Sequence, residues 1–499
     1  MKHLHAHPIN ILENTSKYLI LLLLPLLRAL ATSIFVWSQD ERWFYTWIAG
    51  AWFDLMILGI MLGLGIYQWF RYTFSFNDNG IYIQKGIFFL KKRYLAFAKL
   101  TAVSFELPWY YRPIKVVHLT ADTDGGSSVH PDFSITIHQS IAERILSYSK
   151  EPFVQANQIK RGYIPSNFYV AIFSLLTSNS ITGVLYISTA ISQVGNIFGQ
   201  DIGERIVNNF TRIANILAFG LPPAAAILGY TILGCWLISF SINLVKHLRF
   251  SVSREGKVVE INAGIFSKRR FSIATERINS LTIRQSLMSK LFGFFSVFIH
   301  CTGYGKAKNE LSVLMPSGEE TELKTNLLML IPEIPITSRQ IKPKLVNLSR
   351  FLIPPFTGIL CVIGGGLLGI HFLPIFSTTI ICFMLIIGIP FVWWFIVKFY
   401  SFFFTGIGVS QDVITIFYTS GFRIMTSSLP KNKITKIETS QTLFQITTKC
   451  CDVTFYSYAE GQKKQKVVNM NLPEVKKLLN LTDFDLHLEP DKRFTLWKA

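Results

Sequence analysis

Long, almost uncharged apolar runs recur in pairs along this chain, and each pair is followed by a basic segment with the pattern of short β-strands. Each run is at least as long as the roughly 20 residues that a helix needs to cross a bilayer. The runs are 18–37, 45–70, 167–196, 213–245 and 351–397. The last has 47 residues without Asp, Glu, Lys or Arg, which is enough for two spans with a turn near Gly369, His371 and Pro374. We therefore expect six transmembrane helices arranged in three hairpins.

Hairpins and strand-rich segments alternate and divide the chain into six parts. We expect a tail and first hairpin in 1–70, a first β-domain in 71–160, a second hairpin in 161–246, a second β-domain in 247–348, a third hairpin in 349–398, and a third β-domain with a tail in 399–499. The composition agrees with a membrane protein, since 50% hydrophobic residues, 42 Phe and a mean hydropathy of +0.36 exceed the needs of a soluble core.

The first apolar run has a second interpretation, a cleaved signal peptide. Tyr18 to Leu27 forms a short apolar core, and Ala29-Leu30-Ala31 has the spacing of a cleavage site. However, apolar sequence resumes from Ser33 to Trp37, so an uncleaved first span accounts for more of the sequence.

Charge predicts the orientation. The loops at 38–44 and 197–212 hold only Arg42, Arg205 and Arg212, whereas nearly all other Lys and Arg residues lie on the opposite side. By the positive-inside rule, both termini and all three β-domains are then cytoplasmic. The net charge of +19 follows from this topology and from attraction to an anionic leaflet, so we expect no nucleic-acid partner.

The strand-rich segments repeat one pattern: strand, polar turn, strand, Gly-Ile-Phe, basic cluster and third strand. The first copy has Gly86-Ile87-Phe88 before its basic cluster, and the second has Gly264-Ile265-Phe266. A third, weaker copy contains Gly421. Further hairpin turns are expected at 124–126, 316–318 and 460–461, and closing helices near 138–149, 324–331 and 472–480. This pattern predicts a small β-sandwich or partly open barrel with a C-terminal helix.

The repeats resemble the bacterial pleckstrin-homology-like (PH-like) domain of the YdbS/YdbT membrane proteins. The resemblance is strongest in 247–305, where Ile273-x-x-Glu-Arg-Ile-x-x-Leu281 is followed by Gln285-Ser286-Leu287 and Leu291-Phe292-Gly293. It weakens at 107–110 and 441–444, which puts equal roles for the three domains in doubt. The resemblance implies a multipass bacterial membrane protein with cytoplasmic PH-like domains and a smaller YdbS-like protein as a partner.

Two equivalent basic clusters are candidate contacts for anionic lipids, because clustered Lys and Arg bind phosphates through charge-assisted hydrogen bonds. They are Lys91, Lys92 and Arg93 in the first copy and Lys268, Arg269 and Arg270 in the second. General attraction to the leaflet, or edge strands whose lysines block sheet-to-sheet association, also explains them.

Two sites are expected within the membrane. Arg28 and Asp54 each lie 13 residues from position 41, so antiparallel helices place them at one depth, where they would pair. Thr177, Ser178 and Asn179 form a polar stretch in the third span that suits a broken helix at a substrate site or contacts between helices.

Catalytic signatures such as GxxxxGK[ST], HExxH and GxSxG do not occur, and we expect no enzyme activity, cofactor or metal site. The sequence favours a scaffold that assembles with itself or with a smaller relative and supports envelope integrity or resistance to membrane-active agents. The alternative is a transporter or exporter of a small or lipidic molecule.

Overall fold

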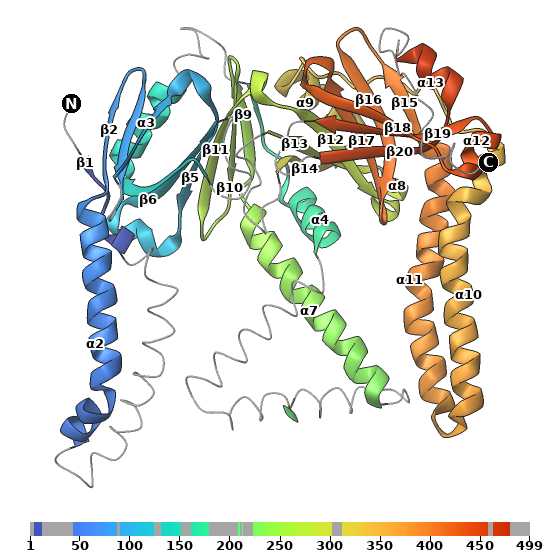
Figure 1. Ribbon diagram of the computed structural model, residues 1–499, viewed down its shortest axis with the longest axis horizontal. Coiled ribbons are helices and arrows are strands. Elements are labelled where there is room, and N and C mark those ends of the chain that lie inside the picture. Colours follow the sequence, from blue (N-terminus) through green and yellow to red (C-terminus); the bar gives the residue numbers. More distant parts are fainter. Residues whose placement is uncertain are drawn as a thin grey trace, which may run out of the picture. The chain divides into compact units, whose positions relative to one another are not determined.

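The computed structural model describes residues 4–11, 43–86, 90–123, 131–150, 161–178, 208–209, 212, 223–301, 312–457 and 463–479. Within them the protein combines helices with antiparallel sheets (Figure 1). Two compact units divide the chain, one made mainly of Met1–Arg277 and the other mainly of residues after Arg277.

Four described helices are long and apolar enough to cross a membrane. Two of these spans, Ala51–Phe70 and Gly229–His247, lie within α2 (Trp43–Phe70) and α7 (Pro223–His247). The other two, Leu345–Phe372 and Pro374–Phe404, contain α10 (Leu348–Phe372) and α11 (Ser377–Phe404). A shorter apolar helix, α4 (Asn167–Thr177), begins where the third span was expected. The first expected span, 18–37, lies outside the described residues.

Helices α10 and α11 run side by side (Figure 1). α10 ends at Phe372 and α11 begins at Ser377, which places the break in the long apolar run at the predicted position. The two helices approach closely at glycines, because a Cβ on Gly358 would meet the ring of Phe391 and one on Gly366 would meet Met384.

The first repeat consists of six strands, divided between two sheets, and a closing helix. Its elements are β2 (Thr73–Asn77), β3 (Gly80–Lys85), β4 (Lys91–Ala96), β5 (Leu100–Leu107), β6 (Val116–Thr123), β7 (Phe133–His138) and α3 (Gln139–Lys150). A strand from the tail, β1 (Leu4–His5), pairs with β2. Asn77 closes the β2–β3 turn by accepting a hydrogen bond from the Gly80 N–H at 3.0 Å.

The second repeat follows the same order. Its elements are β9 (Ser251–Glu255), β10 (Val258–Ala263), β11 (Lys268–Ala274), β12 (Ser280–Ser286), α8 (Leu287–Leu291), β13 (Phe294–His300), β14 (Val313–Glu319) and α9 (Glu320–Leu330). A strand that precedes α4, β8 (Arg161–Tyr163), pairs with β9, as β1 pairs with β2. Gly264, part of the predicted motif, has φ +97 and its Cβ would collide with the carbonyl of Ser267, so only glycine fits there.

The third repeat comprises β15 (Gly406–Val409), β16 (Val413–Ser420), β17 (Arg423–Pro430), β18 (Ile434–Ser440), α12 (Leu443–Thr447), β19 (Cys450–Ser457), β20 (Lys463–Asn471) and α13 (Leu472–Leu478). The closing helices α3, α9 and α13 overlap the three predicted ones. One predicted turn is wrong: Pro316-Ser317-Gly318 lies inside β14. Pairing shifts there, from Phe295 opposite Gly318 to Val297 opposite Met315, so a β-bulge accommodates the proline.

Among the described residues there are four sheets, and they do not follow the boundaries of the repeats. Their strand orders are β1-β2-β3-β4, β7-β6-β5-β11-β10-β9-β8, β14-β13-β12-β17-β16-β15 and β18-β19-β20. The second half of the first repeat therefore shares a sheet with the first half of the second repeat. The second half of the second repeat likewise shares a sheet with the first half of the third.

Two hydrophobic cores lie between a terminal sheet and part of a shared one. In the first repeat, Phe74 and Ile81 pack with Leu119, Ile135 and residues of α3. In the third, Ile407 and Ile416 pack with Val453, Phe455 and Met470. Both cores have the two-sheet form of a β-sandwich closed by a helix, as expected from the strand pattern.

Candidate functional site

A basic pocket of about 520 Å³ lies next to the end of α2 in the first repeat. Its lining residues are Gln68, Tyr72, Ile83, Lys85, Gly86, Lys91, Arg93, Pro131, Asp132, Phe133 and Ser134. Lys91 and Arg93, two of the predicted lipid contacts, come together here. Lys92 does not line it, as expected from the alternation of side chains along β4.

Lys85 adds a third cation that the sequence analysis missed. Its Nζ lies 5.3 Å from the centroid of the Tyr72 ring. Burial, and then the charge of Arg93, lower the pKa of Lys85. The sequence could have indicated this residue, because Lys85 directly precedes Gly86 of the repeated Gly-Ile-Phe motif.

The pocket's own carboxylate is engaged elsewhere. Asp132 Oδ2 accepts hydrogen bonds from the backbone N–H and the hydroxyl of Thr123, at 2.9 and 2.6 Å. Arg93 donates to the main-chain oxygen of Asp132 at 3.3 Å. Three cations facing one bound carboxylate leave an excess of positive charge, so the pocket suits an anion.

The equivalent cluster in the second repeat is bonded to protein carboxylates instead. Arg269 forms an ion pair with Glu106 at 3.0 Å, across the contact between β11 and β5. Arg270 donates to both carboxylate oxygens of Glu260, at 3.0 and 3.1 Å, and Lys150 also pairs with Glu260. Lys268 is exposed and sits opposite Leu107.

Glu260 is the centre of this arrangement, since only 2% of its side chain is exposed. Burial alone raises the pKa of its carboxyl, but the hydrogen bond from Lys150 and the charge of Arg270 outweigh burial and hold the pKa below its usual value. The two basic clusters thus occupy equivalent positions in the repeat but have different partners, and the first lines the basic pocket.

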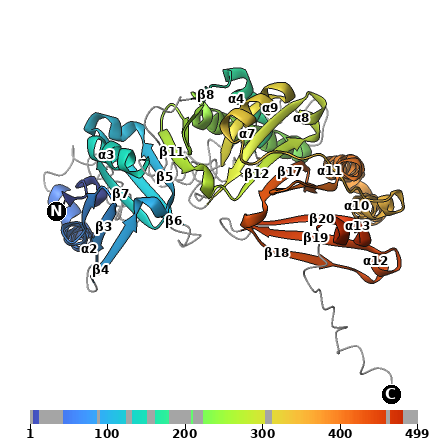
Figure 2. The ribbon, with the colours of Figure 1, turned by 90° about the horizontal axis from the view of Figure 1, so that it is seen from above.

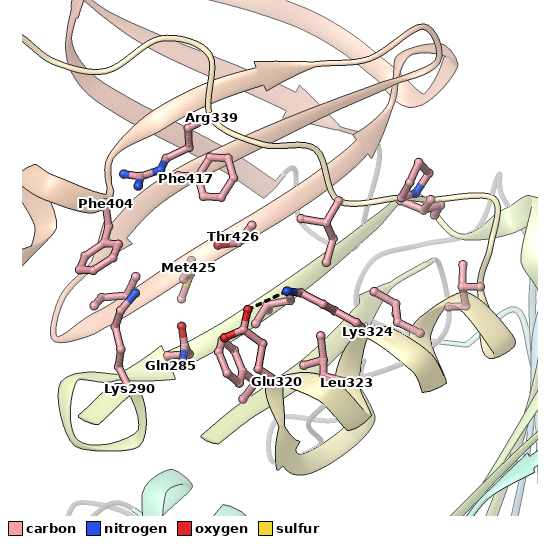
Figure 3. A pocket seen from close by; sticks show the side chains of 18 of the residues that line it. Gln285, Lys290, Glu320, Leu323, Lys324, Arg339, Phe404, Phe417, Met425 and Thr426 are labelled. Atoms are coloured by element: carbon pink, nitrogen blue, oxygen red, sulfur yellow. Dashed lines mark ion pairs between the residues drawn. The ribbon is translucent and has the colours of Figure 1, made fainter. Parts of the chain in front are cut away.

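A second, mostly apolar cavity of about 500 Å³ lies in the other unit (Figure 3). Its bed is formed by β12, β17 and α9, with Ile283, Leu323, Leu327 and Ile424 among the lining residues. Lys290 and Arg339 stand at one side, near Phe404 and Phe417 (Figure 3). The sequence analysis did not predict this cavity, because its lining comes from elements up to about 140 residues apart, from Ile283 to Thr426.

Two of the three cations that line the cavity, Lys290 and Arg339, contact the Phe404 ring at the end of α11. Lys290 Nζ lies 3.1 Å from the centroid of the Phe404 ring, and Arg339 Cζ lies 5.7 Å from it. Burial and the nearby Arg339 lower the pKa of Lys290 to about 8, against the opposing charge of Glu320. Glu320 itself pairs with Lys324 at 2.8 Å (Figure 3). An apolar bed with cations at one side suits the tail and head of an amphiphilic anion.

The expected membrane sites are described only in part. Asp54 is half-buried on α2, whereas Arg28 and Asn179 lie outside the described residues. Helix α4 ends at Thr177, and Ser178 is extended. The Thr177 hydroxyl donates to the Phe173 carbonyl at 2.7 Å, and Ser178 to carbonyls of the same helix.

Among the described residues, no group of three or more His, Cys, Asp or Glu residues is placed to hold a metal ion. The basic pocket of the first repeat suits an anion, and the ion pairs of the second repeat link neighbouring strands.

Comparison with known proteins identifies three copies of one domain. The family model of the bacterial PH domain matches residues 17–150, 209–327 and 352–483. A curated relative, the UPF0699 transmembrane protein YdbT of Bacillus subtilis (strain 168), is 24% identical over 295 residues, covering 55% of this chain and 59% of the relative. The chain thus matches less than two thirds of the length of that relative. No solved structure matches.

Proposed function

Because this chain belongs to the bacterial PH domain family and is a membrane protein, we propose that it is a non-enzymatic membrane scaffold that assembles through its PH-like domains. In this proposal it spans a bacterial cell membrane six times, in three hairpins. Each hairpin is followed by a PH-like domain, with the boundaries predicted above, and both termini and all three domains are cytoplasmic. Its role is in envelope integrity or in resistance to membrane-active agents.

The observation that carries the proposal is the sharing of sheets between repeats. β5 pairs with β11 over six residues, and β12 pairs with β17 over six residues. Strand edges are therefore the surfaces through which these domains join one another. Main-chain hydrogen bonds along an edge serve equally well between chains, as in β-strand addition.

The proposed partner is a smaller membrane protein with a similar domain. Affinity purification of the tagged chain from native membranes, followed by mass spectrometry, should recover such a protein in an amount comparable to the bait. The matched control carries the same tag on an unrelated multipass protein. Recovery of the bait without any other PH-like membrane protein would contradict this part of the proposal.

Anionic lipid is the second proposed partner, through the basic pocket of the first repeat. Replacing Lys85 and Lys91 together by glutamine should reduce binding of the detergent-solubilised protein to vesicles containing anionic lipid. Lys268→Gln is the matched control for Lys91→Gln alone, because both remove one charge and the neighbours of Lys268, Arg269 and Arg270, are already bonded to carboxylates. Equal losses for both variants would show that only overall charge matters.

An Arg28–Asp54 ion pair is proposed to fix the first hairpin, since a lone charge in hydrocarbon costs several kcal/mol. Asp54→Leu should then lower the thermal midpoint of the purified protein and the yield from membranes. The double variant Arg28→Leu/Asp54→Leu should recover most of both. An Asp54→Leu protein with unchanged yield and midpoint excludes the pair.

A further inference from the structure

Two strands, β4 and β18, are the outermost strands of their sheets in the part of the chain that the structure describes (Figure 2). β4 carries four exposed residues, Lys91 to Tyr94, and β18 exposes Thr435, Lys436 and Ser440. Unpaired edges of this kind present main-chain N–H and C=O groups that are ready to pair with another strand.

β4 and β18 are equivalent to the strands that join neighbouring repeats, which are paired in the other sheets. In every repeat, the third strand leads into a short 3-10 helix and then into the fourth strand. The 3-10 helices are Phe97–Lys99, Thr275–Arg277 and Lys431–Lys433. The fourth strands are therefore β5, β12 and β18, and the third strands are β4, β11 and β17.

We call the β5–β11 contact the first junction and the β12–β17 contact the second junction. Each pairs the fourth strand of one repeat with the third strand of the next, antiparallel. Their registers are identical when counted from the 3-10 helices. Val103, four residues after the first of these helices, faces Ser272, three residues before the second. Leu281 faces Ser428 by the same count.

From this repetition we infer that a second copy of this chain adds to the first, with β18 of one copy pairing with β4 of the next. The inference rests on the proposed scaffold function and names its partner. Each chain carries one edge of each kind, so the contact is head-to-tail and generates a ring or a filament. The register of the junctions places Ile437 opposite Tyr94 and Glu438 opposite Arg93.

Charge supports this register. Glu438 and Arg93 would stand directly opposite each other, where opposite charges stabilise a pair of strands. The equivalent pair in the second junction, Thr282 and Ser427, makes a side-chain hydrogen bond of 2.8 Å, so side chains at this position do meet. In the single chain Glu438 accepts from Lys436 at 2.8 Å and from Tyr456 at 3.0 Å, and stays accessible on an edge strand.

Burial supports it as well. At the junctions the equivalent residues are covered: Val103 is 4% exposed, Leu281 0% and Ser428 0%. Tyr94, which corresponds to Ser428, is 48% exposed. A strand that pairs with β4 would cover Tyr94, so that it becomes buried like Ser428 at the second junction.

The test is the mass of the purified full-length protein in detergent or nanodiscs, by light scattering across a concentration series. The wild type should form species larger than one chain. Glu438→Arg and Arg93→Glu should each weaken self-association roughly tenfold or more, because each places like charges opposite. Combining both changes in one chain should restore it. Glu143→Arg and Arg144→Glu, on the exposed face of α3, are the matched controls and should change nothing.

Cysteine cross-linking tests the register and direction. Thr439 and Lys92 should face each other between chains, so a mixture of Thr439→Cys chains and Lys92→Cys chains should form disulfide-linked dimers. Neither variant should dimerise alone, and Gln84→Cys on the neighbouring strand β3 should not replace Lys92→Cys. Dimers of Lys92→Cys alone would overturn the head-to-tail pairing.

Other outcomes separate this inference from the scaffold proposal. A protein that is one chain at all concentrations overturns the inference, while recovery of a smaller PH-like partner from membranes would leave the scaffold standing. If the Glu438 and Arg93 variants self-associate as strongly as the wild type, the inference is also wrong, because assembly then uses another surface.

Discussion

The first and second junctions pair their strands in the same register, but the side chains that meet across them differ. At the first, Arg269 pairs with Glu106 across the contact. At the second, the Thr282 and Ser427 hydroxyls share a hydrogen bond, and the apolar cavity lies beside the paired strands. The backbone pairing is thus constant while the side-chain chemistry varies. An ion pair between Glu438 and Arg93 at a third such contact would be one more variant of the same pairing.

Replacing Glu260 on β10 tests the group of ion pairs beside the first junction, and it has the largest expected effect. Glu260→Gln leaves Lys150 and Arg270 without their carboxylate, and removing one partner of a buried ion pair costs about 3–5 kcal/mol. Denaturant unfolding of the wild type and the variant should show this difference in the free energy of unfolding. Hydrogen exchange should rise in β10 and β11 and stay unchanged in β12 and β17. The exposed Glu143→Gln is the control.

This loss should depend on pH in a defined direction. The pKa of Glu260 is lower in the folded protein than its ordinary value of 4.5, so its stabilisation is complete above about pH 4.5 and disappears as the pH falls through the folded pKa. Wild type and Glu260→Gln should therefore converge in stability in acid. A constant difference between them down to the lowest accessible pH would contradict this role.

Truncating Leu281 tests the second junction. Leu281 is 0% exposed on β12, and a buried Leu→Ala change costs about 3 kcal/mol. Hydrogen exchange should now rise in β12 and β17 and not in β5 and β11. Val103→Ala, the equivalent change at the first junction, should give the opposite pattern. Exchange that rises at both junctions in either variant would show that they open together.

The hydroxyl pair of the second junction should have a smaller effect. Thr282→Val removes one partner and leaves the buried Ser427 hydroxyl with less hydrogen bonding, which costs about 1 kcal/mol. Adding Ser427→Ala should recover part of this loss. A double-mutant cycle from unfolding midpoints measures the coupling, and additive losses would exclude a direct interaction.

Lys290 should make stability depend on pH in the direction opposite to that expected from burying a paired lysine, because its charged form is disfavoured in the folded protein. Its pKa in the folded protein is about 8, below the ordinary 10.5, so stability should rise as the pH increases from about 8 to 10.5. Lys290→Met should remove this rise and leave the protein at least as stable at neutral pH. A pH profile identical to that of the wild type would contradict the shift.

Much of the fold was predictable from local patterns. The motif around Gly264 and the closing helices are fixed by residues near one another in sequence, and the family resemblance was correct. Pro316-Ser317-Gly318 misled the prediction, because turn-forming residues also occur in β-bulges.

The junctions were not predictable in this way. Arg269 and Glu106 are 163 residues apart, and an alternating strand pattern does not reveal which strand lies beside it. Lys91 and Arg269 lie on equivalent strands, β4 and β11. Their different roles depend on the carboxylates of Glu106 and Glu260, which distant strands supply.

The sharing of sheets between repeats has a consequence for how the chain is made. β12 leaves the ribosome well before its partner β17, since Leu281 precedes Ser428 by 147 residues. At about 5–20 residues per second, this strand edge waits roughly 7–30 s for its neighbour. The second repeat therefore cannot complete its sheets until β17 of the third repeat has been synthesised, and a chain truncated after α9 would expose an edge that the full-length protein covers.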